Sequence, residues 1–91
     1  MKYLEGITIC DFSNRLPGPL CTQLFIKMGA HVIKIEDESG DPFQQVISEN
    51  DESFKYWYED INKGKQIVKV NFSTDSEKLI KIIQHSDLLL I

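Results

Sequence analysis

Short β-rich segments alternate with helix-forming segments along this 91-residue chain. The β-rich segments lie at Ile7–Asp11, His31–Ile35, Gln66–Phe72 and Asp87–Ile91. Strands that alternate with helices favour a mostly parallel sheet with right-handed crossover connections. We therefore expect an α/β, Rossmann-like fold in the order β-α-β-α-β-α-β. The chain length allows at most one small domain.

The first helix is predicted from Pro19 to Met28. Proline suits the first position of a helix, because a first-turn N–H has no partner within the helix. Leu20, Leu24 and Met28 recur at every fourth residue, so we expect them to form an apolar stripe. Gly29 follows where a left-handed residue typically ends a helix.

Two further helices are expected. The segment Asp51–Ile61 is amphipathic, and its apolar side chains are Phe54, Trp57 and Tyr58. The last helix follows the possible capping oxygens of residues 73–76 and closes at His85-Ser86. Its predicted buried face consists of Leu79, Ile80, Ile82 and Ile83. Residues 36–50 are predicted to form a loop.

The composition excludes several classes of function. A net charge of −4 gives no electrostatic case for binding nucleic acid or an anionic membrane. The longest uninterrupted apolar run, LLLI, is far shorter than a membrane span, and no signal peptide is visible. Cys10 and Cys21 stand at predicted core positions and match no CxxC or metal-ligand spacing. We expect both thiols to be reduced, as in a cytoplasmic protein.

The segment Arg15–Pro19 joins the first strand to the first helix. It carries Pro-Gly-Pro where nucleotide-binding folds usually carry glycines. Gly18 lets the backbone approach a ligand, and the following helix N-terminus offers N–H groups and a positive dipole end to an anion. The alternative is a rigid corner with Arg15 on the surface, and the spacing alone favours this alternative.

Other charged segments carry weaker signals. The two lysines of Asn62–Lys65 suit a phosphate, but an ordinary charged turn explains them more simply. Nine of the fourteen acidic residues lie between Glu36 and Asp60; they match no metal-binding motif, so we expect a solvated acidic face and no metal.

The remaining titratable groups are assigned structural roles. His31 and His85 lack partners at ligand spacing, so we expect an edge or capping role for each. Asp11 ends the first strand and is expected to cap the turn at Ser13 and Asn14. No GxSxG, Walker or GxGxxG motif is present. The residues by themselves indicate a nucleotide-type α/β domain without a defined reaction.

Four segments, in this order along the chain, point to one family. They are LEGITICDFSNRLPGPLCTQLFIKMGAHVIKIED, SGDP, NKGKQIVKVNF and SDLLLI. Together they resemble the N-terminus of the class III CoA-transferase and α-methylacyl-CoA racemase family over essentially all 91 residues. The resemblance implies that residues 1–91 are a partial CoA-binding domain, the N-terminal fragment of a longer chain. The apolar strand Asp87–Ile91, on which the chain stops, agrees with this expectation.

The resemblance also implies a site for coenzyme A, as part of the substrate. In this family the turn after the first strand lines the nucleotide pocket, so Arg15, Leu16 and Pro17 would contact CoA. Asp37 stands where the family often has an arginine that meets a CoA phosphate. Phosphate recognition would therefore fall to Arg15, Lys63 or Lys65.

A second part of the implied site is the end of the third strand. Val70, Asn71 and Phe72 match the stretch that packs beside adenine and ribose in the family. Asn71 replaces the more usual aspartate, which keeps a hydrogen-bonding side chain but removes its charge.

The family contains two reactions. Its transferases use an aspartate to attack the acyl thioester, and its racemases exchange the proton on the carbon α to the thioester with a His/Asp pair. The segments RLPGP, KIED and GDP are closer to the racemase branch, whose substrates are 2-methylacyl-CoA esters. In both branches the catalytic residues lie downstream of Ile91.

The expected partners are acyl-CoA and, in the full-length protein, a second copy in an interlocked homodimer. Two alternatives involve no catalysis by this chain. One is a CoA- or nucleotide-binding module, and the other is a partner subunit for a longer chain.

Overall fold

A computed structural model describes residues 2–14, 17–39 and 52–91, with only the backbone for residues 52–55. The predictions for Arg15, Leu16, the side chain of Phe54 and the loop at residues 40–50 lie outside this part. The elements are, in order, β1 (Thr8–Asp11), α1 (Pro17–Lys27), β2 (His31–Asp37), α3 (Glu52–Ile61), β3 (Gln66–Val70), α4 (Ser76–Gln84) and β4 (Leu88–Leu90). The predicted order of strands and helices is confirmed.

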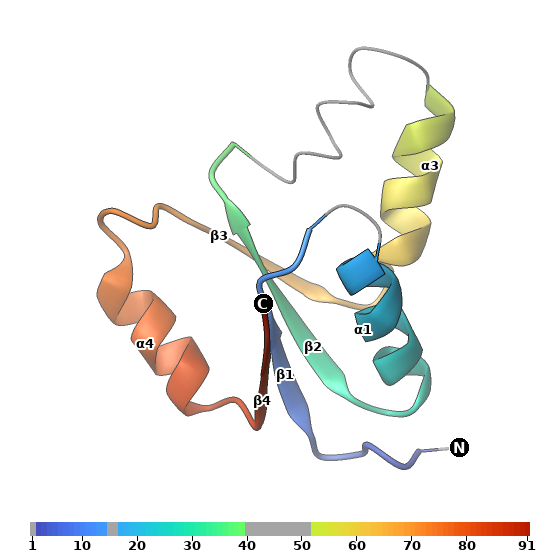
Figure 1. Ribbon diagram of the computed structural model, residues 1–91, viewed down its shortest axis with the longest axis horizontal. Coiled ribbons are helices and arrows are strands. Elements are labelled where there is room, and N and C mark those ends of the chain that lie inside the picture. The colour runs from blue at the N-terminus through green and yellow to red at the C-terminus, as the bar shows by residue number, and fades with distance from the viewer. Residues whose placement is uncertain (1, 15–16, 40–51) are drawn as a thin grey trace.

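The described strands form one sheet in the order β3-β2-β1-β4, and every neighbouring pair is parallel (Figure 1). Doubly wound nucleotide-binding sheets begin with this order. The register places Asp11 of β1 beside Lys34 of β2 and Leu90 of β4. The carboxyl ends of β1 and β2 are therefore central in the sheet, where a ligand site is expected.

Helices cover both faces of the sheet: α1 and α3 lie on one side, and α4 lies on the other (Figure 1). Adjacent residues of β1 point to opposite faces, as the pleat of a strand requires. Ile9 packs with Ala30 and Val32 under α1, whereas Cys10 packs with Ile35 and Val70 under α4. The two central strands, β1 and β2, are buried on both faces, whereas the outer strands β3 and β4 are largely exposed.

Helix α1 differs from its prediction in two respects. It begins at Pro17, two residues before Pro19. The predicted apolar stripe is wrong for Leu20 and Leu24, which are 44% and 53% exposed. The face that packs on the sheet carries Thr22 instead, because the Thr22 hydroxyl donates a hydrogen bond to buried Asp11.

The predicted end of α1 is confirmed. Gly29 has a φ of 98°, a left-handed conformation that side-chain-bearing residues rarely adopt. Its N–H donates to the Ile26 carbonyl oxygen at 2.9 Å, which closes the last turn of the helix.

Two strand boundaries and one buried face need correction. Strand β3 ends at Val70, so Asn71 and Phe72 follow the strand and are not part of it. Strand β2 continues to Asp37, so Glu36 and Asp37 are strand residues and not part of a loop. The predicted buried face of α4 is wrong for Ile80 and Ile83, which are exposed. Leu79 and Ile82 alone, of the four predicted residues, pack against the core.

The ends of α4 combine one correction with one confirmation. Asp75 stands at the N-cap but makes no side-chain cap. Its carboxylate instead accepts a hydrogen bond from the Asn71 N–H at 2.8 Å. His85 occupies the C-cap, and its Nδ1 lies 2.7 Å from the Lys81 carbonyl oxygen, so the capping role is confirmed.

Candidate functional site

The carboxyl ends of the parallel strands meet at one edge of the sheet. Ligands of open α/β sheets bind outside this edge. Of the seven predicted contacts, five are described here: Pro17, Asp37, Val70, Asn71 and Phe72. Pro17 opens α1 just after β1, and the other four lie where β2 and β3 end.

The Pro-Gly-Pro turn is shaped by a close approach between two segments. A Cβ atom at Gly18 would overlap the Cβ and Oγ of Ser13, which follows β1. Glycine is therefore required for the segment after β1 to pack against the first turn of α1. The sequence suggested backbone clearance for a ligand, whereas the structure shows clearance for the chain itself.

The two prolines reduce what this helix end offers to an anion. The first four N–H groups of a helix have no intrahelical acceptor, so Pro17 and Pro19 remove no helical hydrogen bond. They do remove two of the four free donors. Among the described residues at this helix end, Gly18 carries the N–H that remains free of a helical acceptor, because Leu20, the fourth residue of α1, already donates its N–H within the helix.

Asp11 connects β1 to the turn and to α1. Its Oδ1 accepts hydrogen bonds from the Ser13 N–H at 2.7 Å and from the Ser13 hydroxyl. Its Oδ2 accepts one from the Thr22 hydroxyl at 2.8 Å. The predicted capping role of Asp11 is therefore confirmed, and the carboxylate is fully buried.

Lys65 reaches the same place from the turn between α3 and β3. Its Nζ donates to the Pro19 carbonyl oxygen at 2.8 Å and to Asn62 Oδ1 at 2.9 Å. It also lies 3.9 Å from Asp11 Oδ2, and the Lys65 side chain has no exposed surface. The prediction of an ordinary charged turn is wrong for Lys65, and its ammonium is not accessible to a phosphate. No local pattern distinguishes it from the exposed Lys63.

A second buried pair lies on β2. Lys34 Nζ donates to the Ser13 carbonyl oxygen at 3.0 Å and lies 3.9 Å from Glu36 Oε2, which also accepts the Tyr58 hydroxyl. Glu36 Oε1 is buried and accepts no hydrogen bond from the described residues. The prediction of a solvated acidic face is thus wrong for Glu36.

The two pairs belong to one set of contacts, because Asn62 Nδ2 donates to the Tyr58 carbonyl oxygen at 3.0 Å. We call this set the buried polar network. Its members are Asp11, Ser13, Thr22, Lys34, Glu36, Tyr58, Asn62 and Lys65. The network joins β1 and β2 to α1 and α3, and it reaches the Pro-Gly-Pro turn through the contact of Lys65 with Pro19.

The ends of β2 and β3 form the other part of the predicted site. Asp37 and Val70 are partners in the strand register, and the Glu38 N–H donates to the Val70 carbonyl oxygen at 3.1 Å. The Val70 side chain is fully buried, whereas Phe72 is 52% exposed. Phe72 therefore offers a ring surface on which a base can stack.

The polar groups at the ends of β2 and β3 are mainly hydrogen-bond acceptors with negative charge. Hydrogen bonds from the hydroxyl and N–H of Ser39 hold the pKa of Asp37 below its ordinary value of 3.8, so this carboxyl is ionised near neutral pH. Asn71 Nδ2 lies 3.4 Å from Glu38 Oε2, and Asn71 Oδ1 accepts the Ser73 N–H. An anionic phosphate is repelled from the Asp37 side of this edge.

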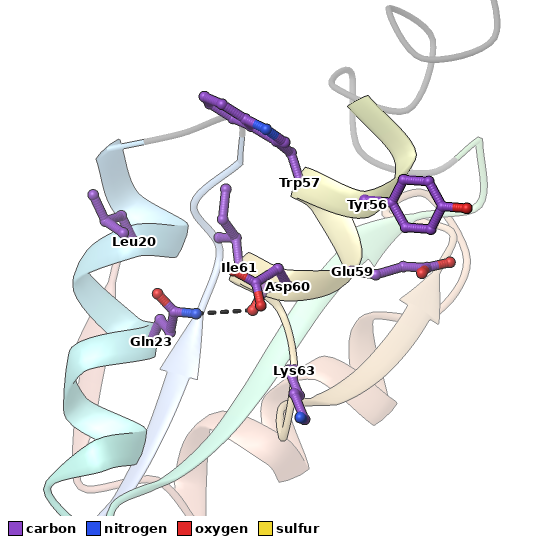
Figure 2. Close-up of a pocket in the computed structure, with 8 residues that line it drawn as sticks. All are labelled: Leu20, Gln23, Tyr56, Trp57, Glu59, Asp60, Ile61 and Lys63. Carbon is purple, nitrogen blue, oxygen red and sulfur yellow. Dashed lines mark hydrogen bonds between the residues drawn. The ribbon is translucent and has the colours of Figure 1, made fainter. Parts of the chain in front are cut away.

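A cavity of about 830 Å³ lies between α1 and α3. Figure 2 shows its lining residues: Leu20, Gln23, Tyr56, Trp57, Glu59, Asp60, Ile61 and Lys63. Gln23 Nε2 donates to the Asp60 carbonyl oxygen at 2.8 Å and ties the two helices together. Trp57 was predicted on the apolar side of its helix, yet it is 56% exposed, whereas Tyr58 is buried.

Two negative observations concern the described residues alone. Among residues 2–14, 17–39 and 52–91, no cluster of three or more His, Cys, Asp or Glu side chains is arranged to hold a metal ion. In that same part of the chain, no helix has the length and apolar character needed to cross a membrane. Cys10 and Cys21 are both free thiols, with Cys10 buried and Cys21 half-buried.

The described strands form an all-parallel sheet with helices on both faces, which defines an α/β protein. In such proteins ligands bind at the carboxyl edge of the sheet, where the Pro-Gly-Pro turn lies. Comparison with known families makes this assignment specific. Residues 4–90 match the model of CoA-transferase family III, and the chain belongs to this family.

Similar proteins agree with the assignment. The chain is 28% identical to a succinyl-CoA:mesaconate CoA-transferase of Haloarcula marismortui, over 98% of this chain and 24% of that protein. It is 33% identical to a formyl-CoA:oxalate CoA-transferase of Escherichia coli, over 94% of this chain and 21% of that protein. The crystal structure of Rv3272 from Mycobacterium tuberculosis superposes with a TM-score of 0.84 and 27% identity, over 100% of this chain and 25% of that one. The chain thus spans about a quarter of the length of these relatives.

Proposed function

We propose that residues 1–91 form the N-terminal, CoA-binding part of an enzyme that transfers CoA between carboxylic acids. Membership of CoA-transferase family III is the observation that carries this proposal. The relatives named above as succinyl-CoA:mesaconate and formyl-CoA:oxalate CoA-transferases support CoA transfer as the reaction class. Coenzyme A is a substrate moiety in this proposal, and acyl-CoA is the partner.

The proposed binding mode places CoA along the carboxyl edge of the sheet. Adenine stacks on the exposed ring of Phe72, and the ribose lies beside Asn71. The Gly18 N–H faces the phosphates at the start of α1. Arg15, Leu16 and Pro17 keep their predicted role as CoA contacts. The exposed Lys63 lies near the other end of α1, where its neighbour Gly64 approaches Ile26, and takes no part in this binding mode.

The carboxylates at the edge are not suited to nucleophilic attack on a thioester. Asp11 is buried and accepts hydrogen bonds from Ser13 and Thr22. Asp37 is exposed but lies beside the proposed nucleotide position and not beside a thioester. A nucleophilic aspartate downstream of Ile91, as the family resemblance implies, fits these observations.

The racemase reaction is the second candidate, and the segments RLPGP, KIED and GDP favour it. A racemase exchanges the α proton of a 2-methylacyl-CoA without moving CoA, and a transferase moves CoA without exchanging that proton. The native protein in deuterated water therefore distinguishes the two candidates. Deuterium at the α carbon with no CoA transferred would contradict our first proposal.

CoA binding by the 91-residue chain is tested by thermal unfolding during a CoA titration. Ligand at 100 times Kd stabilises a protein by about 2.7 kcal/mol, so a clear rise in Tm is expected. We expect Phe72→Ala to reduce the rise. Trp57→Ala serves as the matched control, because Trp57 is similarly exposed but lines the cavity between α1 and α3. No rise in Tm at millimolar CoA contradicts the proposal.

The assembly and location of the protein are further proposals. An interlocked homodimer is expected for a full-length family member, and sedimentation of the native protein tests it. A cytoplasmic location agrees with the two free thiols.

A further inference from the structure

Residues 71–75 run from the end of β3 to the start of α4, and we call them the β3–α4 turn (Figure 1). Asn71 and Asp75 close this turn by a reciprocal contact. The Asn71 N–H donates to Asp75 Oδ2 at 2.8 Å, and the Asp75 N–H donates to the Asn71 carbonyl oxygen at 2.8 Å. The Ser73 N–H donates to Asn71 Oδ1 at 2.9 Å, so the turn is also bonded from within.

The carboxylate of Asp75 has an unusual partner for its position. Asp75 stands at the N-cap of α4, where an aspartate side chain commonly accepts a hydrogen bond from the first turn of the helix. It makes no such cap, and its carboxylate accepts the Asn71 N–H instead. The Asp75 side chain therefore stabilises the turn before α4 and not the first turn of the helix.

The peptide unit between Val70 and Asn71 is held at both of its polar groups. Its carbonyl oxygen, on Val70, accepts the Glu38 N–H at 3.1 Å and is thereby tied to the end of β2. Its N–H, on Asn71, is the group that Asp75 accepts. Because a peptide unit is planar, these two contacts fix the direction in which the chain enters Phe72.

Phe72 depends on this arrangement for the placement of its ring. The Val70 side chain is fully buried, whereas Phe72 is 52% exposed, so the backbone and not a packed core holds the ring. A ring that is already ordered binds a base more tightly, because ordering it on binding costs free energy. The negative charge of Asp75 would repel a phosphate, so any favourable effect of Asp75 on CoA binding passes through the turn.

We propose that Asp75 is a positioning residue for the nucleotide part of the CoA site. Its carboxylate holds the Asn71 N–H and so keeps the Phe72 ring in place for stacking on adenine. The adenine assignment rests on the proposed function, whereas the ordering of the turn by Asp75 does not. The two parts are therefore tested by separate readouts.

The test compares the 91-residue chain with Asp75→Ala, Asp75→Asn and two controls. Asp75→Asn removes the charge but keeps an oxygen that can accept the Asn71 N–H. The control Ser73→Ala changes an exposed side chain of the same turn, and Ile82→Ala weakens the packing of α4 on the core. Three quantities are measured for each: Kd for CoA by calorimetry, Tm, and the backbone order parameter of Phe72 from ¹⁵N relaxation without ligand.

We expect Asp75→Ala to weaken CoA binding roughly tenfold, since one hydrogen bond to a charged group contributes about that factor. We also expect it to lower the order parameter of Phe72. Asp75→Asn and Ser73→Ala should retain the affinity and the order of Phe72, and Ile82→Ala should lower Tm alone. If Asp75→Ala does not fold, Asp75→Ser replaces it and should show the same loss, because serine suits the N-cap but its oxygen lies one bond closer to the backbone.

Each remaining outcome decides one part. If the parent chain binds CoA and Asp75→Ala binds it equally well, the positioning role is overturned. An equal loss of affinity in Ile82→Ala also overturns it, because the effect is then general destabilisation. If the parent chain does not bind CoA, the proposed function fails. A lowered order parameter of Phe72 in Asp75→Ala then supports the ordering role of Asp75, and an unchanged value overturns it.

Discussion

The ammonium of Lys65 lies 3.9 Å from the carboxylate of Asp11, and neither side chain is exposed to solvent. A buried ion pair is stable only where hydrogen bonds satisfy both groups. Here Ser13 and Thr22 donate to Asp11, and Pro19 and Asn62 accept from Lys65. The pair therefore fixes the junction of β1 and α1, on which the proposed CoA site depends.

Removing one member of this pair leaves the other charge buried without its counterion. We expect Asp11→Ala to lower the free energy of unfolding by about 3–5 kcal/mol. Urea denaturation measures the loss. Lys63→Met is the control, and we expect it to change stability by less than about 0.5 kcal/mol because Lys63 is exposed. Equal stability of Asp11→Ala and the parent chain would show that the pair contributes nothing.

Gly18→Ala tests the close approach in the Pro-Gly-Pro turn. Alanine is the better helix former by about 1 kcal/mol, so propensity alone predicts stabilisation. We expect the opposite, a loss of about 1–3 kcal/mol, because the new Cβ overlaps Ser13. Adding Ser13→Gly removes the overlapping atoms and should restore part of the stability. A stabilised single variant would contradict the packing described here.

The sequence predicted the order of the helices and strands well because each of them has a local pattern of apolar and turn-forming residues. Four apolar runs and a glycine stop at Gly29 were enough for the order β-α-β-α-β-α-β. No local sequence pattern shows which charged side chains become buried. Lys63 and Lys65 are two lysines of the same turn. Lys65 is buried because it contacts Asp11 and Pro19, which are distant in sequence.

The candidate site has a weaker local signal in the sequence than the helices and strands have. The end of β3 and the turn before α1 follow from the family resemblance. The limited number of free N–H groups in α1 depends on where the helix begins, and the predicted start at Pro19 missed Pro17. Exposure of Leu20 and Leu24 was missed because Thr22, a polar residue, faces the sheet through its bond to Asp11.

Tyr58 and Glu36 provide a test of the second buried pair. Tyr58→Phe removes the hydroxyl that donates to Glu36 Oε2. A buried carboxylate that loses a donor costs about 1–3 kcal/mol, so we expect a loss of this size in chemical denaturation. In a double-mutant cycle with Glu36→Gln, the two losses should not add, because the residues are in contact. Additive losses would show that the contact carries no coupling energy.

Cys10 gives the stability a defined pH dependence. Burial raises the pKa of its thiol above the ordinary value of 9.0, a hydrogen bond with Ser86 opposes the rise, and the Asp11 charge adds to it. The unfolded chain therefore releases the proton first. The stability linked to this thiol is fully present below 9.0 and is lost as the pH rises through the folded-state pKa.

Cys10→Ala, compared with the parent chain from neutral to alkaline pH, isolates this contribution. We expect the difference in free energy of unfolding between the two proteins to shrink as the pH rises above 9.0. Cys21→Ala is the control, because Cys21 is only half-buried. A difference for Cys10→Ala that stays constant over this range would contradict the raised pKa.

The most direct test of CoA binding at the carboxyl edge is a CoA titration of the ¹⁵N-labelled chain, followed by the amide shifts of every residue. We expect saturable shifts at Gly18 in α1 and at Asn71 and Phe72 after β3. Amides in the middle of α4, on the far side of the sheet from α1, should remain unchanged. Shifts confined to α4 and β4, or no shifts at millimolar CoA, would contradict CoA binding at the carboxyl edge.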